Sequence, residues 1–329
     1  MFTMRFDLRA PAGGAPIADL YAAALEMAEW GERHGCLAAI VSEHHGSPDG
    51  YLPAPLPLAG AMLARTQRIM VNVAAVLLPL HDPVRIAEQL VVLDLIAPGR
   101  ITFVAGLGYR DAEYEMADVD KKQRGRLLEE YVEVLRKAWT GEPFEWRGRE
   151  VLVTPTPATP GGPMIMIGGG SEPAARRAAR LRCGFFPSLG DQALADAYDD
   201  EARKVGFEGG FCSLPKGPSG MVLVSDDPDA LWEQVGPHAL YDAQIYSSWQ
   251  RNEQASAIDV HDAQSWEDVR ASGVYQILTP DECVALAEEQ GDFGTVMLHP
   301  LVGGLSPDIA WSSLELFEQK VLSRLRPGV

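Results

Sequence analysis

The sequence predicts an α/β fold: a TIM (β/α)8 barrel formed by a single domain over residues 1–329. Short apolar runs alternate with longer amphipathic stretches, which is the pattern of βα units around a parallel sheet. Eight strands separated by helices close into a barrel, and the chain of 329 residues exceeds the roughly 250 of a typical barrel. The eight predicted strands are residues 3–9, 37–42, 69–76, 100–105, 164–168, 183–187, 219–224 and 294–299.

The stretches between these strands have the period of helices. One series recurs at helical spacing and ends before Gly35, where a C-terminal stop is expected: Leu20, Ala24, Met27 and Gly31. A second series repeats this spacing between the fourth and fifth strands: Leu127, Tyr131, Val134 and Ala138.

Three segments exceed a minimal barrel. Residues 106–122 form a polar insertion after the fourth strand, and residues 140–163 are predicted to form a hairpin and a proline-rich connector before the fifth. Residues 225–293, after the seventh strand, are longer than one helix requires. Because long connections in a compact domain usually carry function, we expect residues 225–293 to form a lid over the active site.

The composition restricts the partners and the compartment. The formal net charge is −18 and the isoelectric point about 4.8, which disfavours nucleic acid as a partner. No apolar run approaches the roughly 20 residues of a membrane span, and the start of the chain lacks the pattern of a secretory signal. The four cysteines are scattered without a CxxC pair, so we expect a cytoplasmic protein with reduced thiols and no membrane partner.

The end of the second strand, Ser42-Glu43-His44-His45-Gly46, is the leading candidate for chemistry. In a barrel this end faces the active site, and a histidine beside a carboxylate suits proton transfer near neutral pH. The alternative is that a histidine only caps the strand or bonds a loop carbonyl. A metal site is disfavoured: His81 and His299 also follow strands, but no His-x-His or HExxH pattern exists.

The third strand contains two small residues near its end, Ala74 and Ala75. They would let a flat ring approach the backbone closely, or they fill the core of a tight barrel, and the sequence does not separate these alternatives.

The fourth strand leads into Gly106 and Gly108, followed by Tyr109 and Arg110. Glycines after a strand allow a ligand to approach the backbone, although a short glycine motif is weak evidence alone. Arg110 either pairs with a phosphate or pairs with Glu113, three residues later.

The fifth strand ends in Gly168-Gly169-Gly170-Ser171, directly before a helix. Glycines that open a helix expose N–H groups at the positive end of its dipole, which predicts a phosphate site. Pro173 fits the first helical turn. The arginines of this helix add positive charge or form a solvated face: Arg176, Arg177 and Arg180.

Together these segments resemble the bacterial luciferase-like family, whose flavin monooxygenases and deazaflavin-dependent reductases share one TIM-barrel fold. The segments that match in order and spacing are SEHHG (42–46), NVAAVLLPLHDPVRIAE (72–88), GRITFVAGLGYRDAEY (99–114) and MIMIGGGSEPAARRAAR (164–180). The segment RGRLLEEYVEVLRKAW (124–139) is also similar to that family's helix before the GEPFEWRG hairpin. The resemblance covers nearly the whole chain.

The resemblance implies a flavin that lies across the barrel mouth. His44 would exchange a proton beside the flavin C4a–N5 edge, and Glu43 would contact or orient the ring system. Ala74 and Ala75 would be joined by the non-prolyl cis peptide that some members place behind the ring. The phosphate would be held by Gly168, Gly169, Gly170 and Ser171.

The two consecutive histidines cannot share this role, because successive side chains on a strand end point to opposite sides. The resemblance selects His44, whose tautomer Glu43 or a backbone carbonyl would fix, and makes His45 secondary.

Two cofactors are compatible with the resemblance: FMN, delivered reduced by a separate flavin reductase, and coenzyme F-420, which only transfers hydride. The Glu-His-His sequence resembles the FMN branch more closely, and the negative net charge mildly disfavours the polyglutamate tail of F-420. We therefore expect an FMN-dependent monooxygenase that uses O2 on a small organic substrate, with F-420-dependent hydride transfer as the alternative. The residue types at Leu107, Gly169 and Gly170 differ from those of the luciferases themselves, which argues against light emission.

Two other classes stay compatible with the sequence: a TIM-barrel metal hydrolase and a flavin-binding protein without turnover. The resemblance also implies a homodimer, with the helices after the second and third strands at the interface. The aromatic residues of the long insertion either line an apolar pocket or form the insertion's own core: Tyr246, Trp249, Trp266 and Tyr275.

Overall fold

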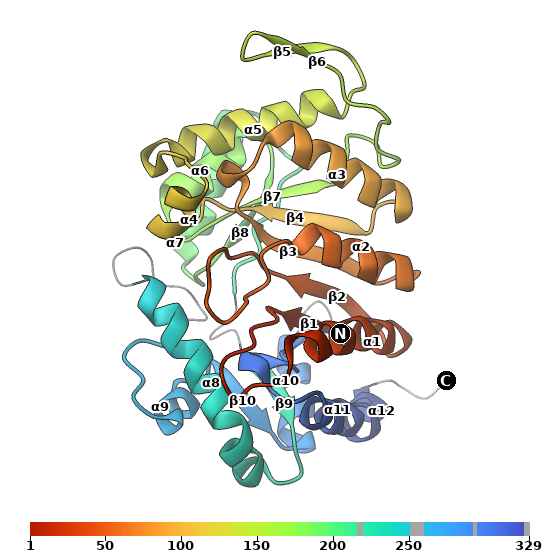
Figure 1. Cartoon of the computed structure of the whole chain (residues 1–329), viewed down its shortest axis with the longest axis vertical. Helices are drawn as coiled ribbons and strands as arrows, with labels where there is room; N and C mark the ends of the chain where they lie inside the picture. Colours follow the sequence, from red (N-terminus) through yellow and green to blue (C-terminus); the bar gives the residue numbers. More distant parts are fainter. Residues whose placement is uncertain (216–219, 251–259, 292–294, 326–329) are drawn as a thin grey trace.

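The computed structural model describes residues 1–215, 220–250, 260–291 and 295–325. A sheet of nine parallel strands forms its centre, and the helices lie on the outside (Figure 1). In sheet order the strands are β10 (Tyr275–Leu278), β9 (Met221–Val224), β11 (Val296–Leu298), β1 (Phe2–Phe6), β2 (Cys36–Val41), β3 (Met70–Val76), β4 (Ile101–Ala105), β7 (Met164–Gly169) and β8 (Gly184–Pro187). This is the α/β barrel architecture that the sequence predicts.

The helices alternate with the strands along most of the chain. The longer ones are α1 (Ile17–Arg33), α2 (Pro55–Arg65), α3 (Pro83–Ile96), α5 (Arg124–Ala138), α6 (Glu172–Arg180), α7 (Gln192–Lys204), α8 (Pro228–Gln250), α10 (Pro280–Gln290) and α11 (Pro307–Leu316). Three short helices are α4 (Asp111–Met116), α9 (Trp266–Ser272) and α12 (Ser323–Leu325). No helix in the described ranges is long and apolar enough to cross a membrane.

Both predicted helical series are confirmed. The residues spaced at helical intervals in α1 and α5 are the ones that these helices bury against the sheet. Gly31 of α1 is necessary for this packing, because a Cβ there would collide with the side chain of Met4. Gly35 ends the turn after α1 with a φ of 84°, a conformation that favours glycine.

The strands separate a hydrophobic layer on the outside from a more polar inside. In β1, Phe2, Met4 and Phe6 belong to the hydrophobic core under the helices, whereas Thr3 and Arg5 line a cavity inside the sheet. This alternation follows from the two-residue period of a strand. Polar and ionisable side chains that could bind or react with a ligand therefore lie inside the barrel and at its rim.

The prediction of eight strands misses β10, which lies in the segment predicted as a lid. β10 pairs in parallel with β9, so β9 lies between β10 and β11. A run of four apolar and polar residues is too short for periodicity to reveal a strand. Residues 225–293 thus supply part of the barrel wall together with α8, α9 and α10, and not a lid alone.

The predicted hairpin is confirmed as β5 (Phe144–Trp146) paired antiparallel with β6 (Arg149–Val151). It projects beyond α5 at one end of the molecule (Figure 1). The first predicted strand, by contrast, is too long: β1 ends at Phe6, and Asp7 and Arg9 leave the ladder to form buried ion pairs.

Candidate active site

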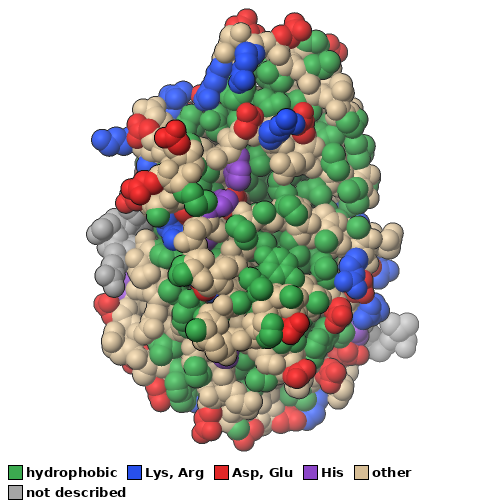
Figure 2. Space-filling view, viewed as in Figure 1, with side chains coloured by type: hydrophobic (Ala, Val, Ile, Leu, Met, Phe, Trp, Pro, Cys, Tyr) green, Lys and Arg blue, Asp and Glu red, His purple; other side chains and the backbone are tan. Residues whose placement is uncertain are grey.

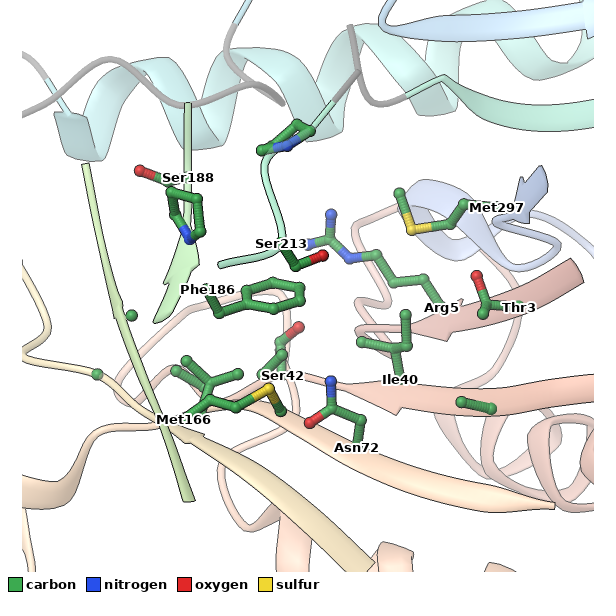
Figure 3. A pocket seen from close by; sticks show the side chains of 18 of the residues that line it. Thr3, Arg5, Ile40, Ser42, Asn72, Met166, Phe186, Ser188, Ser213 and Met297 are labelled. Atoms are coloured by element: carbon green, nitrogen blue, oxygen red, sulfur yellow. The ribbon is translucent and has the colours of Figure 1, made fainter. Parts of the chain in front are cut away.

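A cavity of about 1090 Å³ lies inside the sheet and reaches the carboxyl ends of the strands. This volume is at the upper end of the roughly 300–1,000 Å³ typical of ligand pockets. Its lining comes from strands on both sides of the barrel, including β1, β2, β3, β4, β7, β8 and β10. Figure 3 shows side chains from these strands that point into the cavity. Figure 2 shows histidine side chains (purple) at the surface near the middle of the face.

His44 lies in the cavity wall, 7% exposed, immediately after β2. Its Nδ1 is 2.8 Å from Oε1 of Glu113, on the short helix α4, and its Nε2 is 3.3 Å from the hydroxyl of Tyr109. Burial opposes ionisation of Glu113, but the hydrogen bonds from His44 and from the backbone N–H of His45, together with the nearby positive charges, outweigh it and lower the pKa of the Glu113 carboxyl. Because an ionised carboxylate only accepts, Nδ1 carries the proton and Nε2 keeps its lone pair.

Burial lowers the pKa of His44, and the hydrogen bond to Glu113 opposes that shift only in part. The imidazole is therefore neutral near pH 7, with Nε2 beside Tyr109. A neutral imidazole whose other nitrogen is fixed by a carboxylate can accept and return a proton at Nε2. The expectation that Glu43 or a backbone carbonyl fixes this tautomer is wrong, since Glu113 does so.

Aromatic rings surround His44. The ring centroids of Tyr51, Tyr246 and Trp249 lie 4.9, 6.2 and 4.8 Å from the imidazole centroid. Tyr246 and Trp249 come from the end of α8, so this part of the long insertion covers the histidine. Tyr51, which is buried in the loop between β2 and α2, was not predicted as a site residue, because no motif marks it.

The other two aromatic residues of the insertion lie elsewhere. Trp266 stacks on Trp232 at 5.9 Å in a second hydrophobic cluster, and Tyr275 donates to Asp242 from β10. Both alternatives left open by the sequence thus apply: Tyr246 lines the cavity, whereas Trp266 and Tyr275 belong to the second cluster. The most polar part of the expected lid, residues 251–259, lies outside the described residues.

Glu43 and His45 form a separate cluster with His81. Oε1 of Glu43 is 2.7 Å from Nε2 of His45 and 2.6 Å from Nε2 of His81, and Oε2 accepts from the backbone N–H of Leu77 at 2.8 Å. Burial alone would raise the pKa of Glu43, but the hydrogen bonds from the two histidines lower it to about 2. The bond to Glu43 raises the pKa of His45.

This cluster is the described group whose geometry comes nearest to a metal site, since its three ligand atoms lie within 4.8 Å of one another. However, both histidine nitrogens already share one carboxylate oxygen at hydrogen-bond distance. The cluster is complete without an ion.

Ala74 and Ala75 line the cavity and are joined by a cis peptide bond, as the resemblance implies. Gly106 and Gly108 line it as well. A Cβ at Gly106 would lie 2.8 Å from Cβ of Ala75, and Gly108 has a φ of 72°. The ends of β3 and β4 therefore meet without side chains between them, which leaves backbone exposed to the cavity.

The predicted phosphate loop borders the same cavity. Gly168, Gly169 and Ser171 line it, and Gly170 lies between them in sequence. Gly169 has a φ of 150°, and a Cβ there would lie 2.6 Å from Cβ of Ala174. Ser171 is the N-cap of α6, and its side chain forms no capping bond with the helix.

Arg124, at the start of α5, also lines the cavity and was not predicted as a site residue. Together with the N-terminus of α6 it offers positive charge to an anion. The arginines of α6 each pair with a carboxylate: Arg176 with Glu172, and Arg177 and Arg180 with Glu129.

Arg110 pairs with Glu113, the second of the two alternatives that the sequence left open. Its guanidinium donates to Oε1 of Glu113 at 3.2 Å and to the backbone oxygen of His45 at 2.7 Å. It also lies over the ring of Trp249, 4.1 Å from the centroid. Arg110 thus supports the carboxylate that orients His44, and its placement does not favour a phosphate contact.

A family model described as luciferase-like monooxygenase matches residues 3–289, and the chain therefore belongs to this family. An F420-dependent glucose-6-phosphate dehydrogenase of Nakamurella multipartita is 32% identical over 224 residues, which are 62% of this chain and 63% of that relative.

Solved structures agree with the fold over the full length. A monooxygenase, RslO1, from Streptomyces bottropensis has a TM-score of 0.77 at 21% identity and covers 99% of both chains. The oxygenating constituent of 3,6-diketocamphane monooxygenase from Pseudomonas putida, solved in complex with FMN, has a TM-score of 0.69 at 20% identity and covers 98% of both. At these identities the likeness establishes the fold alone.

Proposed function

We propose that this member of the luciferase-like monooxygenase family is an FMN-dependent monooxygenase that uses reduced flavin and O2 on a small organic substrate. The observation that carries the proposal is the neutral His44 imidazole, fixed by Glu113, in the wall of a cavity that also borders the Gly168–Ser171 loop. One end of this cavity can hold a phosphate and the other can move a proton. That combination suits a flavin phosphate and a reacting ring edge.

The residues present fit a flavin. The glycines at 168 and 169 leave no room for side chains, which lets a ligand approach the backbone at the start of α6. Ser171 and Arg124 would contact the phosphate, and Ala74, Ala75 and the glycines of β4 would face the ring system. When bound, the flavin would supply hydride transfer or oxygen activation.

The protein's own contribution is proton transfer and the exclusion of water. Glu113 holds Nδ1 of His44 protonated, so Nε2 accepts a proton from the reacting group and returns it later. Tyr51, Tyr246 and Trp249 shield this nitrogen with apolar surface. We propose that the end of α8 acts as the cover of the site, because water shortens the life of reactive oxidants.

F-420-dependent hydride transfer is the second candidate. It is supported by the 32% identity to an F420-dependent dehydrogenase. The proton exchange at His44 would serve this reaction equally, so the geometry of the histidine does not separate the two cofactors.

Titration of the purified protein with FMN, reduced FMN and F-420, followed by absorbance, tests the proposal. We expect binding of FMN, tighter in the reduced form, and substrate-dependent O2 consumption. Binding of F-420 with no affinity for FMN would replace the first candidate by the second, and no binding of either would reject both.

We also propose that the protein forms a homodimer and receives reduced flavin from a separate reductase. Val92, Leu95 and Ile96 are exposed on α3, with exposed fractions of 51, 44 and 51%, on one of the two helices expected at the interface. Light scattering at twice the 35.7 kDa of the chain would support the dimer, and replacement of Leu95 by arginine should then produce monomers.

A further inference from the structure

The inside of the barrel holds polar side chains among its apolar lining. Barrel interiors are normally filled by layers of bulky branched residues. Here the lining includes Thr3 of β1, Asn72 of β3 and Thr102 of β4, and these leave the cavity open. Figure 3 shows Thr3 and Asn72 facing the same space as Ile40, Met166 and Met297.

One side chain in this lining is a buried cation, Arg5 of β1. It is 6% exposed, and Figure 3 shows its guanidinium reaching from the strand into the cavity. Its Nη2 donates to the hydroxyl of Tyr246 at 2.6 Å, and its Nη1 is 3.6 Å from the sulfur of Met221, a weak acceptor. Its Nε has no hydrogen-bond partner in the described part of the chain.

Arg9, four residues later, is a buried arginine in the same region that is paired with carboxylates. Its guanidinium is 2.7 Å from Asp49, 2.5 Å from Asp242 and 3.4 Å from Asp7, all with fully buried side chains. Within the described residues no carboxylate lies within 4.0 Å of Arg5. A guanidinium is always charged, and burying it without a counter-ion is costly.

We propose that Arg5 is the anchor for an anionic oxygen group of the substrate, so that the substrate is an organic acid with an apolar body. This inference rests on the proposed function and deepens it. Nε has no partner and Nη1 has only a weak one, so the guanidinium keeps N–H donors that the oxygens of a carboxylate can accept. Ile40, Met166 and Met297 supply apolar surface for the remainder of the molecule.

Arg5 is connected to the reacting end of the site. The hydroxyl of Tyr246, which accepts from Arg5, lies 2.9 Å from the hydroxyl of Tyr51, whose ring packs against His44. A small acid bound at Arg5 therefore extends toward the imidazole. The net charge of −18 would repel such a substrate at long range, so a local cation is the device that could hold it.

Pairs of probes with the same shape and different charge test the anchor: benzoate against benzamide, and hexanoate against hexanamide. We expect calorimetry on the flavin-free protein to show a preference for each acid of about 10–100-fold, the value of a charge-assisted hydrogen bond. Arg5→Met should abolish this preference, Arg5→Lys should keep part of it, and Thr3→Val, in the same lining, should leave it unchanged. Equal binding of acid and amide by the unaltered protein, or a preference that survives Arg5→Met, overturns the proposal.

Thermal unfolding separates a binding role from a structural one. Arg5→Met should melt at the same temperature as the unaltered protein or higher, because it replaces a buried cation that has no carboxylate within 4.0 Å in the described residues by an apolar chain. Arg9→Met should melt far lower, since it removes the cation that three buried carboxylates share. A loss for Arg5→Met as large as that for Arg9→Met means that Arg5 is structural and overturns the proposal.

The anionic oxygen that Arg5 binds could belong to the cofactor instead of the substrate. If Arg5→Met weakens the binding of reduced FMN but not of oxidised FMN, and leaves the acid preference intact, then Arg5 serves the flavin and the proposal fails. The acid preference is measured without flavin, so it can hold even if FMN binds to none of these proteins, an outcome that rejects only the proposed function.

Discussion

His44 and His45 are adjacent in sequence and lie in opposite environments. His44 lines the cavity and pairs with Glu113, and burial lowers its pKa. His45 points to the other side of the chain and pairs with Glu43, which raises its pKa. Near neutral pH the first is suited to exchange a proton, whereas the second forms an ion pair more readily.

The difference shows that neither residue type nor neighbourhood in the sequence determines the role of a histidine. Each imidazole has a buried carboxylate partner at 2.7 or 2.8 Å. The two residues differ in the side of the chain on which they lie. His44 faces the cavity, whereas the carboxylate partner of His45 also binds a second histidine, His81.

Replacement of each histidine by alanine should give the largest difference between the two residues. His44→Ala should lower turnover by about 10²–10⁴-fold, the usual cost of losing a general acid or base, and keep most flavin affinity. His45→Ala should cost far less, through local packing. Single-turnover rates on variants with unchanged circular dichroism would measure this, and the reverse ranking would show that the assignment of the two sides is wrong.

The two carboxylates provide a second contrast. Glu113→Gln keeps the shape of the site and removes the charge that fixes His44, so turnover should fall by about 10–100-fold. Glu43→Gln should reduce turnover less and lower the melting temperature, because Glu43 holds His45, His81 and the backbone of Leu77. A larger loss of turnover for Glu43→Gln would restore Glu43 as the orienting carboxylate.

Tyr109 should have a smaller effect. Its hydroxyl is 3.3 Å from Nε2 of His44, and Tyr109→Phe removes only this neutral hydrogen bond. We expect turnover to fall by about 2–10-fold. The pH at which activity declines on the acid side should move as well, and an unchanged profile would mean that Tyr109 does not contact the histidine during the reaction.

The dependence of stability on pH should differ in sign between the histidines. Burial holds the folded pKa of His44 below the ordinary histidine value of about 6.5, so its contribution to the free energy of unfolding is present above that pH and is lost as the pH falls. The folded pKa of His45 is above 6.5, so its contribution is present below that value and is lost as the pH rises through the folded pKa. Urea unfolding of His44→Gln and His45→Gln against the unaltered protein, between about pH 5 and 8, should give opposite slopes. Slopes of the same sign would contradict the pairings.

The barrel and the opposite orientations of His44 and His45 could be predicted because both follow from short-range patterns, whereas only the resemblance selected His44 as the residue that faces the site. Apolar runs and helical spacing identify the wall, and the two-residue period of a strand end separates His44 from His45. The resemblance added the cis peptide between Ala74 and Ala75, which is confirmed.

The partners of these residues could not be predicted, because they are remote in sequence. Glu113 is 69 positions from His44, and the sequence showed it only as a neighbour of Arg110. Arg5 stands in a strand that otherwise reads as wall, and only the structure shows that it lacks a carboxylate. The sequence prediction missed β10 for a different reason: its four residues are too few to show a periodic pattern.

The buried ion pairs of Arg9 have a consequence for protein engineering. They connect the segment after β1 to Asp49 in the loop after β2 and to Asp242 on α8. The insertion after β9 is therefore not an independent module that can be exchanged between relatives to change selectivity. A chimera that lacks the equivalent of Asp242 would leave Arg9 partly uncompensated, at a cost of about 3–5 kcal/mol for breaking a buried pair. Grafts that begin after residue 242 avoid this cost and still replace Tyr246 and Trp249.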